Sequence, residues 1–554
     1  MEQGQTIMAC NRTATVPPQR TVSRRALLTS TAATAAAFAV PNMSRASSTP
    51  EPIPSPPGGA SGIVIGTLRD AKTINPFLTN ESEGDWRCKM LFDEFVASNP
   101  ETYAPEPGLA AEWKINELTF TFTLQPDATF SDGSQVTADD VAFTIKGYLA
   151  KSTGSPRQSN FLSISGAQEF TDGSAEDVLG LKVLNPKTLQ ITLARADAPF
   201  LFNLHNLFVV PRAHLAGKSL TDDAWFQRPV GAGPFVYGEW VSGKRFTANR
   251  NPNYWQRGKP ALSGFAHEVI PDADTLVSEL LASQIGASNY PAPEAKSKLE
   301  HNPKLKVFVP PFGAPNGWMF NCANEWLSKK EVRRAIALAL DTKTFTENAL
   351  HGLGKPGNGP IAPNNWAYDH DLEPIPYDVK TAKEMIRVAG LPEGTTIRFM
   401  VNKENEMRQE WLKFTQDALQ QLGIQVVPEV IDYQTVLDRV TGAKDYDACG
   451  VDFTGVTAEP SELFNQFHSG GAANYMNYSN QKLDVLLEAA REEMNLERAK
   501  VIYKQVQAII MDDVPTFFAW YRPFLHVVMR KFGGYTDSAA YGLFQTLEDW
   551  TINS

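Results

Sequence analysis

The residues with the most reactive side chains are spread through this chain without the spacing that catalysis or metal binding needs. The eight histidines lie at positions 205, 214, 267, 301, 351, 370, 468 and 526 and show no metal-ligand spacing. No G-x-S-x-G, H-E-x-x-H, P-loop or paired C-x-x-C motif occurs. The sequence therefore predicts no catalytic residue, no metal site and no cofactor.

One arginine is a candidate for noncovalent binding of a carboxylate. Arg408 follows "VNKENEM" at the start of an expected helix. Its planar guanidinium can receive a ligand carboxylate through two parallel hydrogen bonds. An arginine in this position is also often an ordinary surface residue, so both interpretations stay open.

Length and composition limit which elements can position such residues. A chain of 554 residues suggests two to four domains, and 42% hydrophobic residues allow sizeable cores. The net charge of −11 argues against nucleic acid or an anionic membrane as the main partner. These values predict an acidic, globular protein.

Residues 1–46 differ from the rest because they carry five arginines and a single acid. "SRRALL" precedes an alanine-rich apolar run, and "SRA" at residues 44–46 fits small-x-small cleavage. Arg24 and Arg25 are typical of a twin-arginine export signal, which predicts a periplasmic protein. A disordered basic tail before a buried helix is the alternative. Residues 47–60 hold five prolines and predict a stiff linker.

Export after folding in the reducing cytoplasm disfavours obligatory disulfides. Cys10 precedes the predicted cleavage point, and Cys88 lies in an apolar helical pattern typical of a core thiol. A bridge between Cys322 and Cys449 after export stays open.

Periodicity predicts a strand-rich first half and a more helical second half. "LTFTFTLQ" alternates like a half-buried strand, Thr137 is an expected helix N-cap, and "LKVLNPKTLQITL" reads as a hairpin across Asn185 and Pro186. Other expected helices are residues 85–96, 379–389, 409–422, 483–490 and 496–511, and one beginning at Glu331. The strand-like "TIRFMV" and "IQVVPEV" alternate with the later helices. The predicted fold class is α+β with an α/β second half.

Several segments, in order, resemble the extracytoplasmic solute-binding proteins of family 5, which serve dipeptide and oligopeptide ABC importers. The matching stretches run from about residue 63 to 550 and are "PGLAAEW", "FTFTLQPDATFSDGSQVTADDVAFTI", "PVGAGPFVYGEW" with "NRNPNYW", "FNCANEWLSKKEVRRAIALALD" and "YDVKTAKEMIRVAGL". Each fragment alone is weak, but five in sequence are specific.

The resemblance implies a two-lobed periplasmic-binding-protein fold of the large, peptide-binding type, with three domains and a ligand cleft between the lobes. Lobe I would be discontinuous, formed by residues 61–104, 210–310 and 522–554. Residues 105–209 would form its extra subdomain, and residues 311–521 would form lobe II. Such a protein would close like a hinge over its ligand.

The resemblance also singles out "FTGVTAEP", residues 453–460. In dipeptide-type members the matching loop reads aromatic, Thr, Gly, Asp, two residues, Asp or Glu, Pro, and its aspartate pairs with the α-amino group of the ligand. Phe453, Thr454 and Gly455 match this pattern, but Val456 replaces the aspartate. A valine cannot offset the desolvation of an ammonium group, so a plain dipeptide ligand is disfavoured.

Two interpretations of Val456 follow. Either Asp452, Asp93 or Glu94 binds the amine instead, or the ligand has no free α-amine at this place. Phe95 completes the segment "LFDEF", which matches the region where lobe I meets the ligand backbone in the family. These acids can equally be solvent-facing structural residues.

The family resemblance implies four further aromatic candidates for the cleft wall, and aromatic walls suit ligands of mixed polarity. Ordinary core packing is the alternative for each of them. They are Trp318, Trp366, Tyr433 and Trp520.

The sequence therefore predicts a monomeric periplasmic binding component of an ABC importer that hands peptides or peptide-like solutes to permease subunits. It is not predicted to be an enzyme or to bind nucleic acid. Val456 keeps an opine, an oligosaccharide or a metal chelate open as the ligand. An enzyme exported by the twin-arginine route and a sensor that docks to a chemoreceptor are the rival functions.

Overall fold

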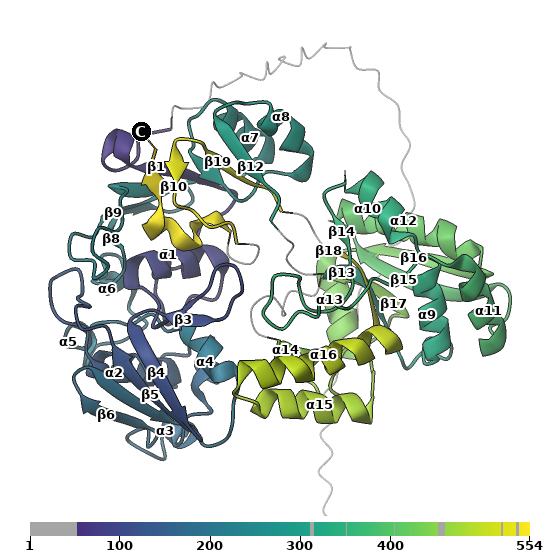
Figure 1. The fold of residues 1–554 in the computed structure, drawn as a ribbon, viewed down its shortest axis with the longest axis horizontal. Helices are drawn as coiled ribbons and strands as arrows, with labels where there is room; N and C mark the ends of the chain where they lie inside the picture. Colours follow the sequence, from purple (N-terminus) through teal and green to yellow (C-terminus); the bar gives the residue numbers. More distant parts are fainter. Residues whose placement is uncertain are drawn as a thin grey trace, which may run out of the picture. The chain divides into compact units, whose positions relative to one another are not determined.

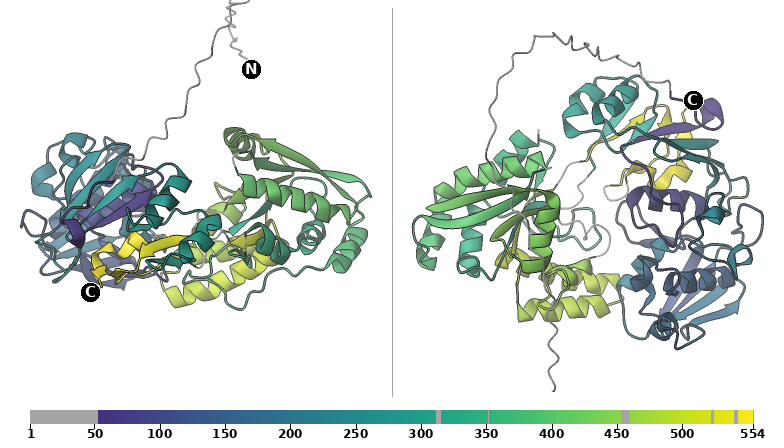
Figure 2. Two further views of the ribbon diagram at one scale, coloured as in Figure 1. Left: turned by 90° about the horizontal axis from the view of Figure 1, so that it is seen from above. Right: turned by 180° about the vertical axis from the view of Figure 1, so that it is seen from behind.

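Three β-sheets of four or more strands, each built from its own set of segments, organise the chain (Figure 1). The structure is a computed structural model and describes residues 53–310, 315–350, 352–403, 405–452, 460–521, 524–538 and 542–553. Helices flank all three sheets, as the two further views also show (Figure 2).

The seven-stranded sheet has the order β12-β19-β11-β1-β10-β9-β8 and draws on three separate stretches of chain. Its strands are β1 (Ile63–Thr67), β8 (Phe235–Val241), β9 (Arg245–Arg250), β10 (Gly264–Val269), β11 (Ala287–Ser288), β12 (Leu305–Phe308) and β19 (His526–Met529). Strand β1 is parallel to β10 and β11, and the other pairs are antiparallel. This part of the chain also contains the helices α1 (Ser82–Phe92), α6 (Asp223–Phe226), α7 (Ala273–Leu281) and α8 (Lys296–Glu300).

The four-stranded sheet is wholly antiparallel, with the order β4-β5-β7-β6. Its strands are β4 (Ala110–Asn116), β5 (Thr119–Leu124), β6 (Leu181–Asn185) and β7 (Thr188–Thr192), and its helices are α2 (Ala138–Leu149), α3 (Ala167–Asp172), α4 (Pro199–Asn203) and α5 (Arg212–Leu215). The predicted hairpin across Asn185 and Pro186 is confirmed as the β6–β7 pair.

The six-stranded sheet has the order β14-β18-β13-β17-β15-β16 and lies in the second half of the chain. Its strands are β13 (Pro315–Phe320), β14 (Lys355–Pro356), β15 (Thr395–Asn402), β16 (Ile424–Ile431), β17 (Ala448–Asp452) and β18 (Thr516–Tyr521). Its helices are α9 (Lys330–Leu338), α10 (Thr342–Ala349), α11 (Val379–Ala389), α12 (Glu406–Gln420), α13 (Tyr433–Asp438), α14 (Glu462–Phe467), α15 (Gln481–Glu492) and α16 (Leu496–Asp513). Strand β15 is parallel to both of its neighbours, β16 and β17.

Both faces of the six-stranded sheet are buried at its central strands, and successive side chains of these strands enter different cores. On β13, Trp318 and Phe320 pack with residues of α9–α12, whereas Met319 packs with residues of α13–α16. On β15, Phe399 and Met400 divide in the same way. The reason is that successive side chains of a strand point to opposite faces of the sheet.

Several local predictions are confirmed by their capping contacts. Thr137 caps α2 in a reciprocal capping box: its Oγ1 accepts from the Asp140 amide at 3.4 Å, and the Asp140 carboxylate accepts from the Thr137 amide at 2.9 Å. Helix α11 has the predicted bounds because Asp378 caps its start and Gly390, with φ of 70°, ends it.

The prediction for the first helix was wrong at both ends. Residues 85–96 were expected, but α1 spans Ser82–Phe92. The Glu81 side chain accepts from the amides of Glu83 and Gly84 and so starts the helix earlier. Asp93, with φ of 64°, ends it because that backbone conformation cannot continue a right-handed helix.

The cysteines that the structure describes are free thiols, so the bridge between Cys322 and Cys449 that the sequence left open is not formed. The four-stranded sheet lies within the expected subdomain, and the six-stranded sheet lies within expected lobe II. The residue boundaries of these domains stay a prediction, since the small β2 (Val96–Ser98) and β3 (Pro105–Pro107) pair bridges the expected boundary at residue 105. In the described part of the chain, no helix has both the length and the apolar character needed to span a bilayer.

Candidate functional site

The topology of the six-stranded sheet creates a crevice at the carboxyl end of β15. From β15 the chain passes through α12 to β16 on one side, and later through α13 to β17 on the other side. The two helices pack on opposite faces, since Trp411 of α12 and Val436 of α13 belong to different cores. Where the connections between parallel strands pass on opposite faces of the sheet, the space beyond the carboxyl ends of those strands stays open for a ligand.

A cavity of about 500 Å³ occupies this place, and we call it the lobe II cavity. This volume lies within the range of small-molecule binding sites. Its walls combine three amides and one arginine with aromatic, thioether and aliphatic side chains. The lining residues are Met319, Asn402, Asn405, Arg408, Tyr433, Val436, Leu437, Val440, Thr441, Gly450, Gln466, Ala473, Tyr475 and Met476.

The polar wall is set by the end of β15 and the first turn of α12. Asn402 is the last residue of β15, and its Oδ1 accepts from Arg408 Nη1 at 2.8 Å. Asn405 is the N-cap of α12, and its Oδ1 accepts from the Arg408 amide at 3.0 Å. The sequence folds in this way because asparagine satisfies the unpaired amides of a helix start. Arg408 is 8% exposed; Asn402 binds its guanidinium, and Asn405 binds its backbone amide.

The facing wall comes from α13 and from β17. Asp432 caps α13 by accepting from the Thr435 amide at 3.0 Å, which places the 51% exposed Tyr433 at the helix start. Gly450 of β17 contributes backbone only. A Cβ there would lie 3.0 Å from Val401 Cγ1 and 3.3 Å from the Trp318 ring, so a larger residue would displace its neighbours.

Gln466 of α14 adds a polar group without a partner. Its Oε1 is buried and accepts no hydrogen bond from any residue that the structure describes. A buried acceptor left unsatisfied destabilises the protein, so a ligand N–H or O–H in this cavity would remove that cost.

The structure brings Arg408 and Tyr433, two of the residues singled out from the sequence, to the same cavity. Asp452 ends β17, whose Gly450 lines it, and pairs through its backbone with Asn316 of β13. Phe453, Thr454, Gly455 and Val456 lie outside the described residues.

Trp318 and Trp520 lie in the core on the opposite face of the sheet, not on the cavity wall. Trp318 is fully buried, donates from Nε1 to Thr415 Oγ1 at 2.9 Å and packs 4.7 Å from the Phe399 ring. Trp520 packs 4.9 Å from the Trp411 ring. Both rings are therefore packed in the core, which is the alternative that the sequence left open.

The segment "LFDEF" lies in the expected lobe I, and its acids have partners in that part of the chain. The Asp93 carboxylate accepts from Trp255 Nε1 at 2.8 Å and from Tyr254 Oη at 3.1 Å. Glu94 lies 3.2 Å from Lys89 Nζ. The described contacts of these acids are thus to residues of lobe I itself.

Phe95 is fully buried, and its ring packs 5.1 Å from the Phe122 ring. The ring contact of this member of "LFDEF" is thus to β5 of the four-stranded sheet.

Burial raises the pKa of Asp93 and of the neighbouring Glu548. Loss of solvent raises the pKa of Asp93 to about 6 and that of nearby Glu548 to about 7, although Lys89 partly opposes both shifts. The Glu548 Oε2 atom is buried and has no hydrogen-bond partner among the described residues. Burial therefore makes the charged forms of Asp93 and Glu548 unfavourable.

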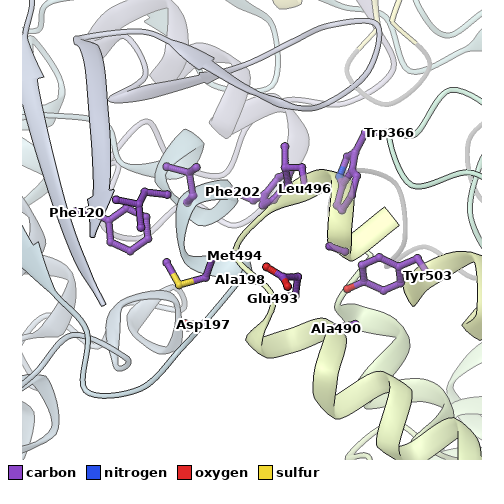
Figure 3. Close-up of a pocket in the computed structure, with 13 residues that line it drawn as sticks. Phe120, Asp197, Ala198, Phe202, Trp366, Ala490, Glu493, Met494, Leu496 and Tyr503 are labelled. Carbon is purple, nitrogen blue, oxygen red and sulfur yellow. The ribbon is translucent and has the colours of Figure 1, made fainter. Parts of the chain in front are cut away.

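Trp366, the last aromatic candidate, lines a different and much smaller pocket of about 20 Å³ (Figure 3). Its ring packs against Phe202 and Tyr503.

Sequence reasoning missed most of the cavity wall, including Asn402, Asn405, Gln466 and Tyr475. One signal was present for the two asparagines. Asn402 directly follows "TIRFMV", and Asn405 comes three residues later, where a buried strand ends and a helix begins. Polar residues at such a junction lie at the carboxyl edge of a parallel sheet.

Comparisons with known proteins agree with this architecture. The family model of bacterial extracellular solute-binding proteins, family 5 Middle, matches residues 104–475. The oligopeptide-binding protein AppA of Bacillus subtilis is 25% identical over 516 residues, which cover 90% of this chain and 92% of AppA. Heme-binding protein A of Haemophilus influenzae is 24% identical over 453 residues, which cover 77% and 81% of the two chains.

A solved structure shows the same fold. The ABC transporter substrate-binding protein CtaP of Listeria monocytogenes aligns with a TM-score of 0.79 at 20% identity, covering 90% of this chain and all of CtaP. With the family model spanning more than half of its length, this chain belongs to family 5 of the bacterial extracellular solute-binding proteins.

Proposed function

We propose that this protein is the periplasmic substrate-binding component of an ABC importer and that it captures a peptide or peptide-like solute. The lobe II cavity is the observation that carries the proposal, because it lies at the switch point of a two-faced sheet in a family 5 chain. The similarity to the oligopeptide-binding protein AppA supports a peptide ligand.

The walls of the cavity suit an amphiphilic ligand. Met319, Val440 and Met476 offer apolar contact, and thioether side chains adapt to ligands of different shape. Arg408 is our proposed partner for an anionic group of the ligand, and Gln466 is our proposed acceptor for an amide N–H.

A metal chelate is the second candidate ligand. The similarity to heme-binding protein A supports it, as does the absence of an acid among the described residues that line the cavity. Val456, in place of the aspartate expected at the amine anchor, also favours a ligand without a free α-amine.

Delivery to the periplasm by a twin-arginine signal in residues 1–46 and function as a monomer are further parts of the proposal. A secreted enzyme and a chemoreceptor-docking sensor are its rivals. Binding of the ligand without chemical turnover would exclude the secreted enzyme. Uptake of the ligand by cells that depends on this protein would exclude a sensor as its sole role.

Thermal denaturation of the mature chain tests the ligand class. The panel contains free-amine dipeptides and oligopeptides, their N-acetylated forms, opines, oligosaccharides and haem. A ligand at 100 times its dissociation constant should stabilise the protein by about 2.7 kcal/mol. Arg408→Gln should abolish most of this gain, whereas Arg387→Gln should leave it unchanged because Arg387 is exposed and pairs only with Glu384.

Each outcome assigns a ligand class or rejects the proposal. Loss of stabilisation on N-acetylation indicates an amine anchor other than Val456. Stabilisation by haem or opines alone replaces the peptide with the second candidate. If no member of the panel stabilises the chain, or if Arg408→Gln responds like the native protein, the proposed function or the proposed role of the arginine is wrong.

A further inference from the structure

Trp366 lies in a contact between lobe II and the subdomain of lobe I. Its ring stacks on Phe202 of α4, with ring centroids 5.7 Å apart and planes at 18°. Tyr503 of α16 meets the same indole edge-on, at 5.9 Å and 82°. Figure 3 shows these three rings around the small pocket, with Leu496 and Met494 of the α15–α16 turn beside them. We call this set of three rings the aromatic contact.

Hydrogen bonds also join lobe II to the subdomain and to the adjoining end of lobe I. The Trp366 amide donates to the Thr102 carbonyl at 3.2 Å, and the Ala198 amide donates to the Arg491 carbonyl at 2.8 Å. Asn364 Nδ2 also donates to Tyr103 Oη. Both parts belong to the unit formed by residues 52–554. The contact therefore fixes lobe II against the subdomain independently of the lobe II cavity, with which it shares no lining residue.

The aromatic contact contains an unsatisfied donor. Trp366 Nε1 is buried and donates to no acceptor in the described part of the chain. Asn364 Oδ1, two residues away, is buried and accepts from no described donor. Buried polar groups are nearly always hydrogen-bonded, and an unmet group opposes the contact that buries it. Opening the contact would let water satisfy both groups.

We propose that the aromatic contact is a reversible latch, in which Trp366 positions lobe II on the subdomain and its unbonded indole N–H keeps the contact weak enough to open. Trp366 is thus a positioning residue and not a ligand contact. A contact that is made in one state of a protein and broken in another changes the populations of the two states. The apparent affinity for a ligand that prefers one state changes with them. This last consequence rests on the proposed function, whereas the latch itself does not.

Hydrogen exchange of the ligand-free mature protein tests the latch directly. The amides of Ala198 and of residue 366 report on it because their hydrogen bonds cross the contact. The Gly286 amide, which donates to the Val64 carbonyl at 2.7 Å inside lobe I, is the internal reference. Trp366→Ala and Trp366→Phe are compared by mass spectrometry of peptides that contain these amides. Trp326→Phe is the matched control, because Trp326 lies in lobe II outside the contact.

The two substitutions should act in opposite directions. Trp366→Ala removes the stack and should speed exchange at Ala198 and residue 366 at least tenfold. Trp366→Phe keeps a stacked ring without the unbonded N–H and should slow exchange at both amides several-fold. Phe202→Ala, on the other side of the contact, should resemble Trp366→Ala. The Gly286 amide and the Trp326→Phe protein should stay as in the native chain.

Other results overturn the latch. Faster exchange in Trp366→Phe would show that the indole N–H does not weaken the contact. Equal exchange of the Ala198, residue 366 and Gly286 amides in every variant would show that the contact does not open separately from lobe I. The hydrogen-exchange measurements use no ligand, so a failure of the latch proposal is distinct from a failure of the proposed function.

Discussion

Gln466 presents a conflict between stability and binding at a single atom. Its Oε1 is buried beside the lobe II cavity and has no described donor. The ligand-free protein bears the cost of desolvating this oxygen, and a hydrogen bond from a ligand would offset it. A residue of similar length without the oxygen should therefore improve one property and impair the other.

Replacing Gln466 with Met should raise the free energy of unfolding of the ligand-free protein by about 1 kcal/mol, because the buried acceptor is removed. The same change should reduce the stabilisation given by any compound that binds in the thermal-denaturation panel. Urea denaturation measures the first effect, and the thermal shift measures the second. A variant that is more stable and binds with unchanged affinity would show that this oxygen has no ligand partner.

Glu548 makes stability depend on pH. Its pKa in the folded protein is about 7, raised by burial from a reference value of 4.5. The folded state therefore holds the proton more tightly than the unfolded state does. The resulting stabilisation is fully present below pH 4.5 and is lost as pH rises through 7.

Glu548→Gln should remove that part of the pH dependence. Between pH 5 and pH 8 the native protein should lose stability that the variant retains, with a difference on the order of 2 kcal/mol at pH 8. Urea denaturation at both pH values measures it. Glu294→Gln, at an exposed glutamate, is the control and should follow the native curve. Parallel pH curves for the native protein and Glu548→Gln would contradict the raised pKa.

At the scale of elements, the start of α12 serves both folding and the cavity. Asn405 caps the helix by accepting from the Arg408 amide and also lines the lobe II cavity. Asn495 caps α16 in the same way, accepting from the Arg498 amide at 3.1 Å, but lies outside that cavity. The two asparagines form a matched pair.

Asn405→Ala and Asn495→Ala should each cost about 1 kcal/mol of unfolding free energy, the usual value of an N-cap. Only Asn405→Ala should also reduce ligand stabilisation, because the first turn of α12 orients Arg408. Urea denaturation with and without a ligand from the panel separates the two effects. Equal ligand responses in both variants would show that the α12 start has no role in binding.

Elements with strong local signals could be predicted from the sequence. Helix α11 has an amphipathic repeat between an aspartate cap and a terminal glycine, and β6–β7 has a short turn between two alternating runs. The α1 boundaries could not be predicted from periodicity, because the Glu81 side chain caps the start and the backbone conformation of Asp93 ends the helix.

At the scale of the whole molecule, the cavity could be predicted only in part. Arg408 and Tyr433 were found, but Met319 and Tyr475 reach the same cavity from positions 156 residues apart in sequence. Their meeting depends on the order of strands in the six-stranded sheet. The alternation along β13 likewise decides that Met319, and not Trp318, lines the cavity, and an aromatic side chain in a buried strand does not indicate which face it takes.

Export can be tested on the intact precursor. Replacing both Arg24 and Arg25 with lysine should leave most of the protein in the cytoplasm with residues 1–46 still attached, because the twin-arginine route reads that pair. Cell fractionation and the mass of the product measure the outcome. Normal processing of the double variant would show that another export route is used.

The alternation along β13 has a consequence for how this fold diversifies. Because Trp318 and Met319 belong to different cores, a substitution at Met319 reshapes the cavity without touching the tryptophan cluster on the other face. Mutations that change ligand preference are thus partly insulated from mutations that threaten folding. Under the proposed function, ligand preference would change through substitutions in the cavity while the tryptophan cluster keeps its packing.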